Sequence, residues 1–121
     1  HQVVTGCALM CPGGPLRSFA VTTGVRMKPL TDDRIERWMA QGEFMGCAGA
    51  YNIEGQVAEV TDDECYQNVA GLPLCHLSAA FLGRLPGVPE IECLPHPPAS
   101  PVPTCDAALC RACRLGPRLL G

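Results

Sequence analysis

Prolines are distributed unevenly along this chain, and their distribution limits where a packed domain can lie. Eight of the twelve prolines occur from Pro86 onward, and the run from Pro95 to Pro103 can form neither a helix nor a central strand. The sequence therefore predicts a folded domain over residues 1–88 and a Pro/Cys-rich tail over residues 89–121. Because the whole chain has 121 residues, we expect one small hydrophobic core.

The first part of the chain has the pattern of a β-hairpin. Residues 3–10 are rich in β-branched and apolar side chains, residues 11–15 (CPGGP) are typical of a turn, and residues 17–27 alternate almost strictly. The face of this second strand that is expected to be buried carries Phe19, Val21, Thr23, Val25 and Met27.

A helix is predicted over residues 32–41. Thr31 can cap its start, Asp32 and Asp33 place negative charge in the first turn, and Gly42 can end it. Its apolar residues Ile35, Trp38 and Met39 repeat at helical spacing. Residues 42–55 then hold four glycines and few charges, which favours a loop that a ligand can approach closely.

The second half of the domain predicts another hairpin and another helix. Residues 56–61 and 64–70 are expected to be short strands joined at Asp62-Asp63. Pro73 can sit in the first turn of a helix that ends before Pro86-Gly87. Its inward side chains are expected to be Leu74, Leu77, Phe81 and Leu85. The expected order is β-β-α-loop-β-β-α, with one short helical turn near residues 105–120 that carries Arg111, Arg114 and Arg118.

Charge and hydropathy exclude several classes of function. Nine basic and twelve acidic residues give a net charge of −3, so binding to a nucleic-acid polymer is not expected. No window has the roughly 18 to 20 apolar residues of a membrane span, and no leader pattern is visible. The nine cysteines are odd in number, and Cys7, Cys47, Cys65 and Cys75 stand singly in apolar stretches. We therefore expect a soluble, cytoplasmic protein rather than a disulfide scaffold.

The glycine-rich loop, residues 42–55, is the segment that is most informative about function. It places the carboxylates of Glu43 and Glu54 and the phenol of Tyr51 on a backbone with little side-chain bulk. The carboxylates can bind a divalent metal or serve as acid and base, but they can equally be solvated surface side chains. The glycines can expose backbone to a phosphate or a base, or they can merely allow two elements to cross closely.

Residues 42–55 (GEFMGCAGAYNIEG) and 68–74 (NVAGLPL) resemble the Maf family of nucleotide pyrophosphatases. Residues 1–6 (HQVVTG), 23–25 (TGV) and 31–35 (TDDRI) resemble further Maf segments in the expected order. The resemblance covers roughly residues 1–85 and corresponds to the C-terminal half of the family's domain. It implies an α/β fold of the Maf/ITPase type, a mixed sheet with flanking helices, with the N-terminal half of the domain absent from this chain.

The resemblance also implies an enzyme, a nucleoside triphosphate pyrophosphatase that releases a monophosphate and pyrophosphate with the help of a divalent cation, Mg²⁺ or Mn²⁺. The family removes noncanonical or modified nucleotides. Two departures bear on this expectation: the family's catalytic Asp-Thr pair has no counterpart here, and the only lysine is Lys28. We therefore expect this chain to be inactive alone, whether it is a fragment, a degenerate paralogue or one half of a split protein.

The substrate-side residues implied by the resemblance are Glu43, Cys47, Tyr51 and Glu54, with Glu43 as a polar residue of the cleft. Cys47 and Glu54 look like the 7-methyl-GTP branch of the family, whereas Ala50-Tyr51 looks like the dTTP and UTP branch. A carboxylate at Glu54 would favour methylated guanine, which is positively charged and presents N–H donors. This reasoning favours 7-methyl-GTP.

The tail offers a second set of candidate ligands. It contains two pairs of residues whose members are separated by two others, Cys93 with His96 and Cys110 with Cys113. Cys105 can substitute for one of these four. Tetrahedral zinc accepts such ligands. The main alternative is unbound thiols in a disordered tail, and a disulfide is a minor one. The competing function is a nonenzymatic nucleotide-binding or protein-interaction module with a zinc-binding tail. An unpaired sheet edge would also allow a homodimer or a complementing N-terminal half.

Overall fold

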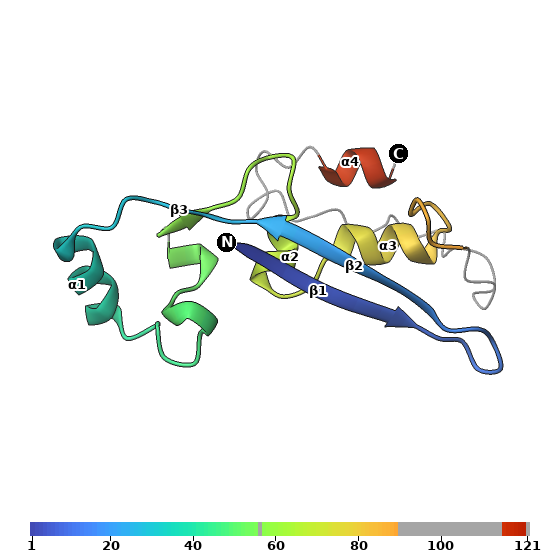
Figure 1. The fold of residues 1–121 in the computed structure, drawn as a ribbon, viewed down its shortest axis with the longest axis horizontal. Helices are drawn as coiled ribbons and strands as arrows, with labels where there is room; N and C mark the ends of the chain where they lie inside the picture. Colours follow the sequence, from blue (N-terminus) through green and yellow to red (C-terminus); the bar gives the residue numbers. More distant parts are fainter. Residues whose placement is uncertain (56, 90–114, 121) are drawn as a thin grey trace.

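The computed structural model describes residues 1–55, 57–89 and 115–120, and Figure 1 shows how its elements are arranged. Four strands, four α-helices and two 3₁₀ turns occur in this part of the chain. In chain order they are β1 (Gln2–Leu9), β2 (Arg17–Gly24), β3 (Arg26–Met27), α1 (Asp32–Gln41), η1 (Ala48–Ala50), η2 (Ile53–Gly55), β4 (Ala58–Glu59), α2 (Tyr66–Ala70), α3 (Leu74–Phe81) and α4 (Leu115–Leu120).

The predicted first hairpin is confirmed. β1 and β2 pair antiparallel from Gln2 opposite Gly24 to Leu9 opposite Arg17. The turn between them is closed by the Gly14 N–H, which donates to the Cys11 carbonyl over 2.9 Å. The hairpin runs through the middle of the molecule, and its tip projects away from the helices (Figure 1).

The second strand is shorter than the alternation predicts. β2 ends at Gly24, and the separate strand β3 pairs instead with β4, through Arg26 opposite Glu59 and Met27 opposite Ala58. The break falls where the chain changes its pairing partner: the Val25 N–H donates to the His1 carbonyl over 2.8 Å, whereas the Lys28 N–H donates to the Val57 carbonyl over 2.9 Å. Val25 is buried as expected, but Met27, in β3, is 38 % exposed.

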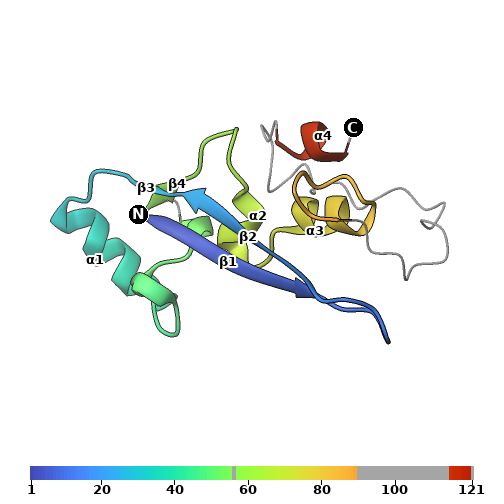
Figure 2. The same cartoon turned by 45° about the vertical axis from the view of Figure 1, so that its right-hand side comes forward.

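Helix α1 has the predicted bounds. Gly42 adopts a left-handed φ of 74° and donates its N–H to the Met39 carbonyl, whereas the Thr31 side chain makes no capping hydrogen bond. The predicted inward face is only partly correct, since Trp38 is buried while Ile35 and Met39 are exposed. Figures 1 and 2 show that α1 lies at one end of the molecule, and most of its residues are exposed.

The second predicted hairpin is wrong. Within residues 57–70, β4 contains only Ala58–Glu59, and residues 66–70 form helix α2. Cys65 and Asn68 are both buried, and their spacing of three residues places them on the same face of a helix but on opposite faces of a strand. The Asn68 side chain bonds to both strands of the hairpin from this helix, so tertiary contacts override the β-propensity of this segment.

Asn68 joins α2 to the hairpin from a position that is 2 % exposed. Its Nδ2 donates to the carbonyls of Val3 and Val21 over 3.2 and 3.1 Å, and it lies 3.1 Å from Thr23 Oγ1. Thr23 is fully buried, and its hydroxyl donates to the Cys65 carbonyl over 3.1 Å. One carboxamide and one hydroxyl therefore tie three elements together at the centre of the fold.

Helix α3 follows Pro73 as predicted but turns a different face inward. Its buried residues are Cys75, Ala79 and Ala80, whereas Leu74 and Phe81 are 40 % and 43 % exposed. Leu85 lies beyond the end of the helix. Small side chains let the helix approach its neighbours closely, and the large ones point toward solvent.

His76 on α3 predicts a dependence of stability on pH. Burial lowers the pKa of this imidazole, and its buried Nδ1 has no hydrogen-bond partner within the described residues. Between the lowered pKa and the unfolded value of about 6.5, the unfolded state binds more protons, so stability rises with pH across this window. We expect urea unfolding to show a smaller free energy at about pH 5.5 than at about pH 7.5. His76→Gln should weaken this dependence, and a variant with the same pH profile would contradict the prediction.

The end of the chain is helical near the predicted place. In α4, Arg118 donates to Asp63 Oδ1 over 3.0 Å, an exposed ion pair that links the tail to the domain. Arg111 and Arg114 lie outside the described residues. The division of the chain at residue 88 stays a prediction, as does the wider mixed sheet, because the described residues form two separate two-stranded antiparallel sheets.

Four of the five cysteines that the structure describes form no disulfide. Cys65 and Cys75 are buried and Cys7 and Cys47 are half-buried, as their apolar surroundings predict. Burial raises the pKa of the Cys7 thiol. Cys11 differs from these four, because it is disulfide-bonded. In the described ranges, no helix has the length and apolarity needed to cross a membrane.

Candidate functional site

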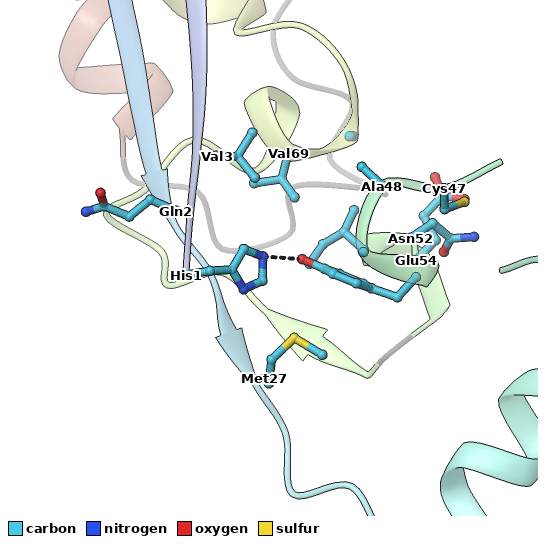
Figure 3. Close-up of a pocket in the computed structure, with 13 residues that line it drawn as sticks. His1, Gln2, Val3, Met27, Cys47, Ala48, Asn52, Glu54 and Val69 are labelled. Carbon is cyan, nitrogen blue, oxygen red and sulfur yellow. Dashed lines mark hydrogen bonds between the residues drawn. The ribbon is translucent and has the colours of Figure 1, made fainter. Parts of the chain in front are cut away.

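A hollow of about 830 Å³ lies between the N-terminal end of the hairpin and the glycine-rich loop. Figure 3 shows its side chains, which come from β1, β3, α2 and the loop. The lining residues are His1, Gln2, Val3, Met27, Cys47, Ala48, Gly49, Tyr51, Asn52, Ile53, Glu54, Val69 and Ala70. Segments that are far apart in the sequence therefore converge on one concave surface.

The loop itself is irregular, as its glycines predict, but it contains the two 3₁₀ turns η1 and η2. Its backbone uses left-handed conformations at Gly46 and Gly49, with φ of 80° and 71°. Ala50 also has a positive φ of 58° and is the only described residue other than glycine to do so. These turns wrap the loop around the end of the hairpin.

Tyr51 and His1 close one side of the hollow. Tyr51 Oη lies 2.6 Å from His1 Nε2, and the two rings meet edge to face with centroids 5.7 Å apart and an interplanar angle of 77° (Figure 3). The N-terminal ammonium donates to the Val25 carbonyl over 3.0 Å, which holds His1 in place. Burial raises the pKa of the Tyr51 phenol, so the phenol stays protonated at neutral pH and keeps its hydrogen as a donor.

Asn52 organises the second turn of the loop. Its Oδ1 accepts the Gly55 N–H over 2.7 Å, and its Nδ2 donates to Glu43 Oε2 over 3.4 Å. The side chain therefore connects the start of the loop to η2 and also lines the hollow. Sequence reasoning missed this residue, although an Asn three residues before a Gly is a recognisable signal for a side-chain-closed turn.

Three of the four predicted substrate-side residues lie together. Cys47, Tyr51 and Glu54 line the hollow, and Glu54 is exposed on η2. Glu43 does not line it: its carboxylate accepts the Asn52 amide, and its backbone carbonyl lies 3.3 Å from Cys47 Sγ. Glu43 thus supports the loop from outside the hollow. A role for any of the four residues in binding stays a prediction.

The described residues do not fit a divalent cation by themselves. Within residues 1–55, 57–89 and 115–120, no group of three or more His, Cys, Asp and Glu side chains gathers in a way that could hold a metal ion. Glu43 is already engaged by Asn52. The predicted zinc ligands Cys93, His96, Cys110 and Cys113, and Cys105 beside them, lie outside the described residues, so the zinc site has no support here.

Comparison with known proteins connects this geometry to a family. The family model described as "Maf-like protein" matches residues 1–83. Among curated relatives, a dTTP/UTP pyrophosphatase of Mesorhizobium japonicum is 40 % identical over 86 residues, covering 69 % of this chain and 41 % of the relative. A dTTP/UTP pyrophosphatase of Alkaliphilus metalliredigens is 43 % identical over 82 residues, covering 64 % of this chain and 42 % of the relative.

A third dTTP/UTP pyrophosphatase, from Halalkalibacterium halodurans, is 46 % identical over 78 residues, covering 61 % of this chain and 40 % of the relative. The chain therefore spans about two fifths of the length of the relatives it matches. No solved structure matches it.

Proposed function

The chain belongs to the Maf-like protein family, and from this premise we propose that it forms the base-binding side of a nucleoside triphosphate pyrophosphatase. The hollow beside Tyr51 is the observation that carries the proposal. It combines the faces of an aromatic ring and apolar side chains with an amide and a carboxylate, which suits a flat base with polar edges. The residues matched by the family include every lining residue of the hollow.

The proposed reaction is attack of water on the α-phosphorus of a nucleoside triphosphate, with release of a monophosphate and pyrophosphate. Such chemistry depends on positioning and on neutralising the phosphate oxygens. Neither Arg nor Lys occurs among the described residues that line the hollow, and the chain has no Asp-Thr pair. We therefore assign to this chain the orientation of the base, and to residues beyond it the phosphate contacts and the activation of water.

A divalent cation, Mg²⁺ or Mn²⁺, belongs to the reaction implied by the family and would neutralise phosphate charge. The part of the chain described above offers no ligand set for one, so the steps assigned to this chain do not involve the metal. Tyr51 offers the face of its ring to the base, Glu54 offers a hydrogen-bond acceptor, and Val3 and Val69 form part of an apolar wall.

For the substrate class we propose a pyrimidine nucleoside triphosphate, dTTP or UTP. The relatives described above carry these nucleotides in their names, whereas none of those names supports the expectation of 7-methyl-GTP. Glu54 is the residue that argues for the methylated purine, and its substitution is a direct test. No observation favours the nonenzymatic module over the pyrophosphatase.

The test measures pyrophosphate release from dTTP, UTP, 7-methyl-GTP and GTP, with Mg²⁺ or with Mn²⁺. One sample holds this chain alone, and a second holds it mixed with the N-terminal half of the Alkaliphilus metalliredigens relative, because we propose that this chain corresponds to the C-terminal half of the family's domain. We expect release only in the mixture, and most from dTTP and UTP.

The controls are each half alone and the mixture without a divalent cation. Release by this chain alone would show that the residues beyond it are not needed, and absence of release in a mixture that forms a complex would contradict the proposed function.

A further inference from the structure

Trp38 is the single tryptophan of the chain and the buried residue of α1, with 8 % of its surface exposed. Its indole N–H donates to the Ala50 carbonyl over 2.8 Å. Ala50 lies in the loop beside the hollow, so the hydrogen bond joins a peripheral helix to the candidate site. The Trp38 side chain therefore contacts a residue outside its own helix.

The Ala50 backbone needs such a partner. A residue with a Cβ is disfavoured in the left-handed region, and Ala50 has a φ of 58° directly after Gly49 at 71°. Its N–H donates to the Cys47 carbonyl over 3.0 Å, and its own carbonyl meets the Trp38 indole. A strained residue persists only when its surroundings hold it, and here the indole is one of the two groups that do so.

The same ring also packs on Gly55, the last residue of η2. A Cβ added at Gly55 would lie 2.6 Å from Cη2 of the indole, closer than real Cβ contacts come, and 3.1 Å from Cε3, which is tighter than most such contacts. The ring therefore touches both ends of the segment 50–55. Tyr51, Asn52 and Glu54, which line the hollow, stand between these two points.

We propose that Trp38 is a positioning residue of the nucleotide pocket. Its indole N–H and ring face hold segment 50–55 in the conformation that presents Tyr51, Asn52 and Glu54 to the hollow. Trp38 itself does not line that hollow, so it acts through the loop. The role as a nucleotide pocket rests on the proposed function, whereas the hold on the loop is testable without any nucleotide.

The first experiment replaces the indole with Trp38→Phe, which removes the N–H and keeps an aromatic ring. Amide hydrogen exchange, measured by NMR on the full chain, reports how often the loop opens. We expect the exchange of the Ala50 and Gly55 amides to accelerate at least tenfold, because their turns lose an anchor. Amides of β1 and β2, which do not touch Trp38, should change less than twofold, and this contrast separates local release from general destabilisation.

The second experiment adds a methyl group from the other side of the contact. Gly55→Ala should displace the indole and accelerate the same loop amides, whereas Gly6→Ala, whose Cβ meets nothing within 4 Å, should not. A hollow of about 250 Å³ beside the ring, lined by Arg34, Arg37, Gln41 and Val57, gives the displaced indole room, so we expect the variant to fold. In a Trp38→Leu background, Gly55→Ala should have a much smaller effect on the loop.

Calorimetric titration with dTTP then connects the loop to binding. We expect Trp38→Phe to weaken dTTP binding about fivefold, the loss of one neutral hydrogen bond. Unchanged loop exchange in both Trp38→Phe and Gly55→Ala would overturn the proposal, as would equal effects of Gly55→Ala in the two backgrounds. If the loop amides respond as expected but the wild-type chain and its complex with the N-terminal half bind no nucleotide, the positioning of the loop stands and the proposed function fails.

Discussion

Asn68→Asp should abolish most of the folding stability of this chain, although the two side chains have nearly the same shape. The Asn68 Nδ2 group donates to two backbone carbonyls and lies beside a hydroxyl in a site that is 2 % exposed. An aspartate would place a carboxylate oxygen against these carbonyl oxygens. An uncompensated buried charge costs about 3 to 5 kcal/mol, a large part of the stability of a small domain.

Urea unfolding followed by circular dichroism and by Trp38 fluorescence measures this effect. Gln41→Glu is the matched control, since it makes the same amide-to-acid change on an exposed residue, and its effect should stay within about 0.5 kcal/mol. Asn68→Asp should also regain part of its stability at low pH, because a protonated carboxyl can donate one hydrogen bond. A loss of unfolding free energy below about 1 kcal/mol would contradict the role assigned to the hydrogen bonds of Asn68.

Glu54→Gln should change which nucleotide the chain binds. The carboxylate of Glu54 only accepts hydrogen bonds, so it can pair with the N3–H of uracil or thymine but repels the carbonyl oxygens on either side of that N–H. A glutamine amide can donate to the same oxygens. We expect Glu54→Gln to strengthen binding of dTTP and UTP about tenfold and to weaken binding of 7-methyl-GTP by a similar factor, which corresponds to about 1.4 kcal/mol in each direction.

The emission of Trp38 is a suitable probe for these titrations, because its indole is bonded to the loop that carries Glu54. Glu36→Gln is the control: it removes the same charge from an exposed position on the helix of Trp38 and should leave the order of affinities unchanged. If the ratio of dTTP to 7-methyl-GTP affinity is the same in the wild type and in Glu54→Gln, Glu54 does not select the base.

The sequence predicted the elements whose signals are local. The turn at residues 11–15 and the alternation after it identified β1 and β2, and Gly42 marked the end of α1. Residues 64–70 carried a β-like composition, yet residues 66–70 form α2, whose helical spacing places the buried Cys65 and Asn68 on one face. The inward faces of α1 and α3 were also misjudged, since apolar periodicity cannot tell which neighbours a helix meets.

The site shows the same limit. The resemblance of residues 42–55 to a known family pointed to Cys47, Tyr51 and Glu54, which do lie at the hollow. It did not point to His1, which meets Tyr51 across 50 positions of the chain, or to Trp38, which meets Ala50 across 12. Pairings over such distances depend on how the elements pack, and packing leaves no local mark in the sequence.

By itself, the sequence determined the family, the first hairpin, the bounds of α1 and the loop that carries the candidate binding residues, because turn residues, caps and family motifs act over a few neighbouring positions. Only the tertiary structure decided that Asn68 is the central polar anchor, that Glu43 supports the loop from outside the hollow, and that Trp38 holds it from α1. Each of these roles depends on partners from another element, whose hydrogen-bonding groups meet only once the chain has folded.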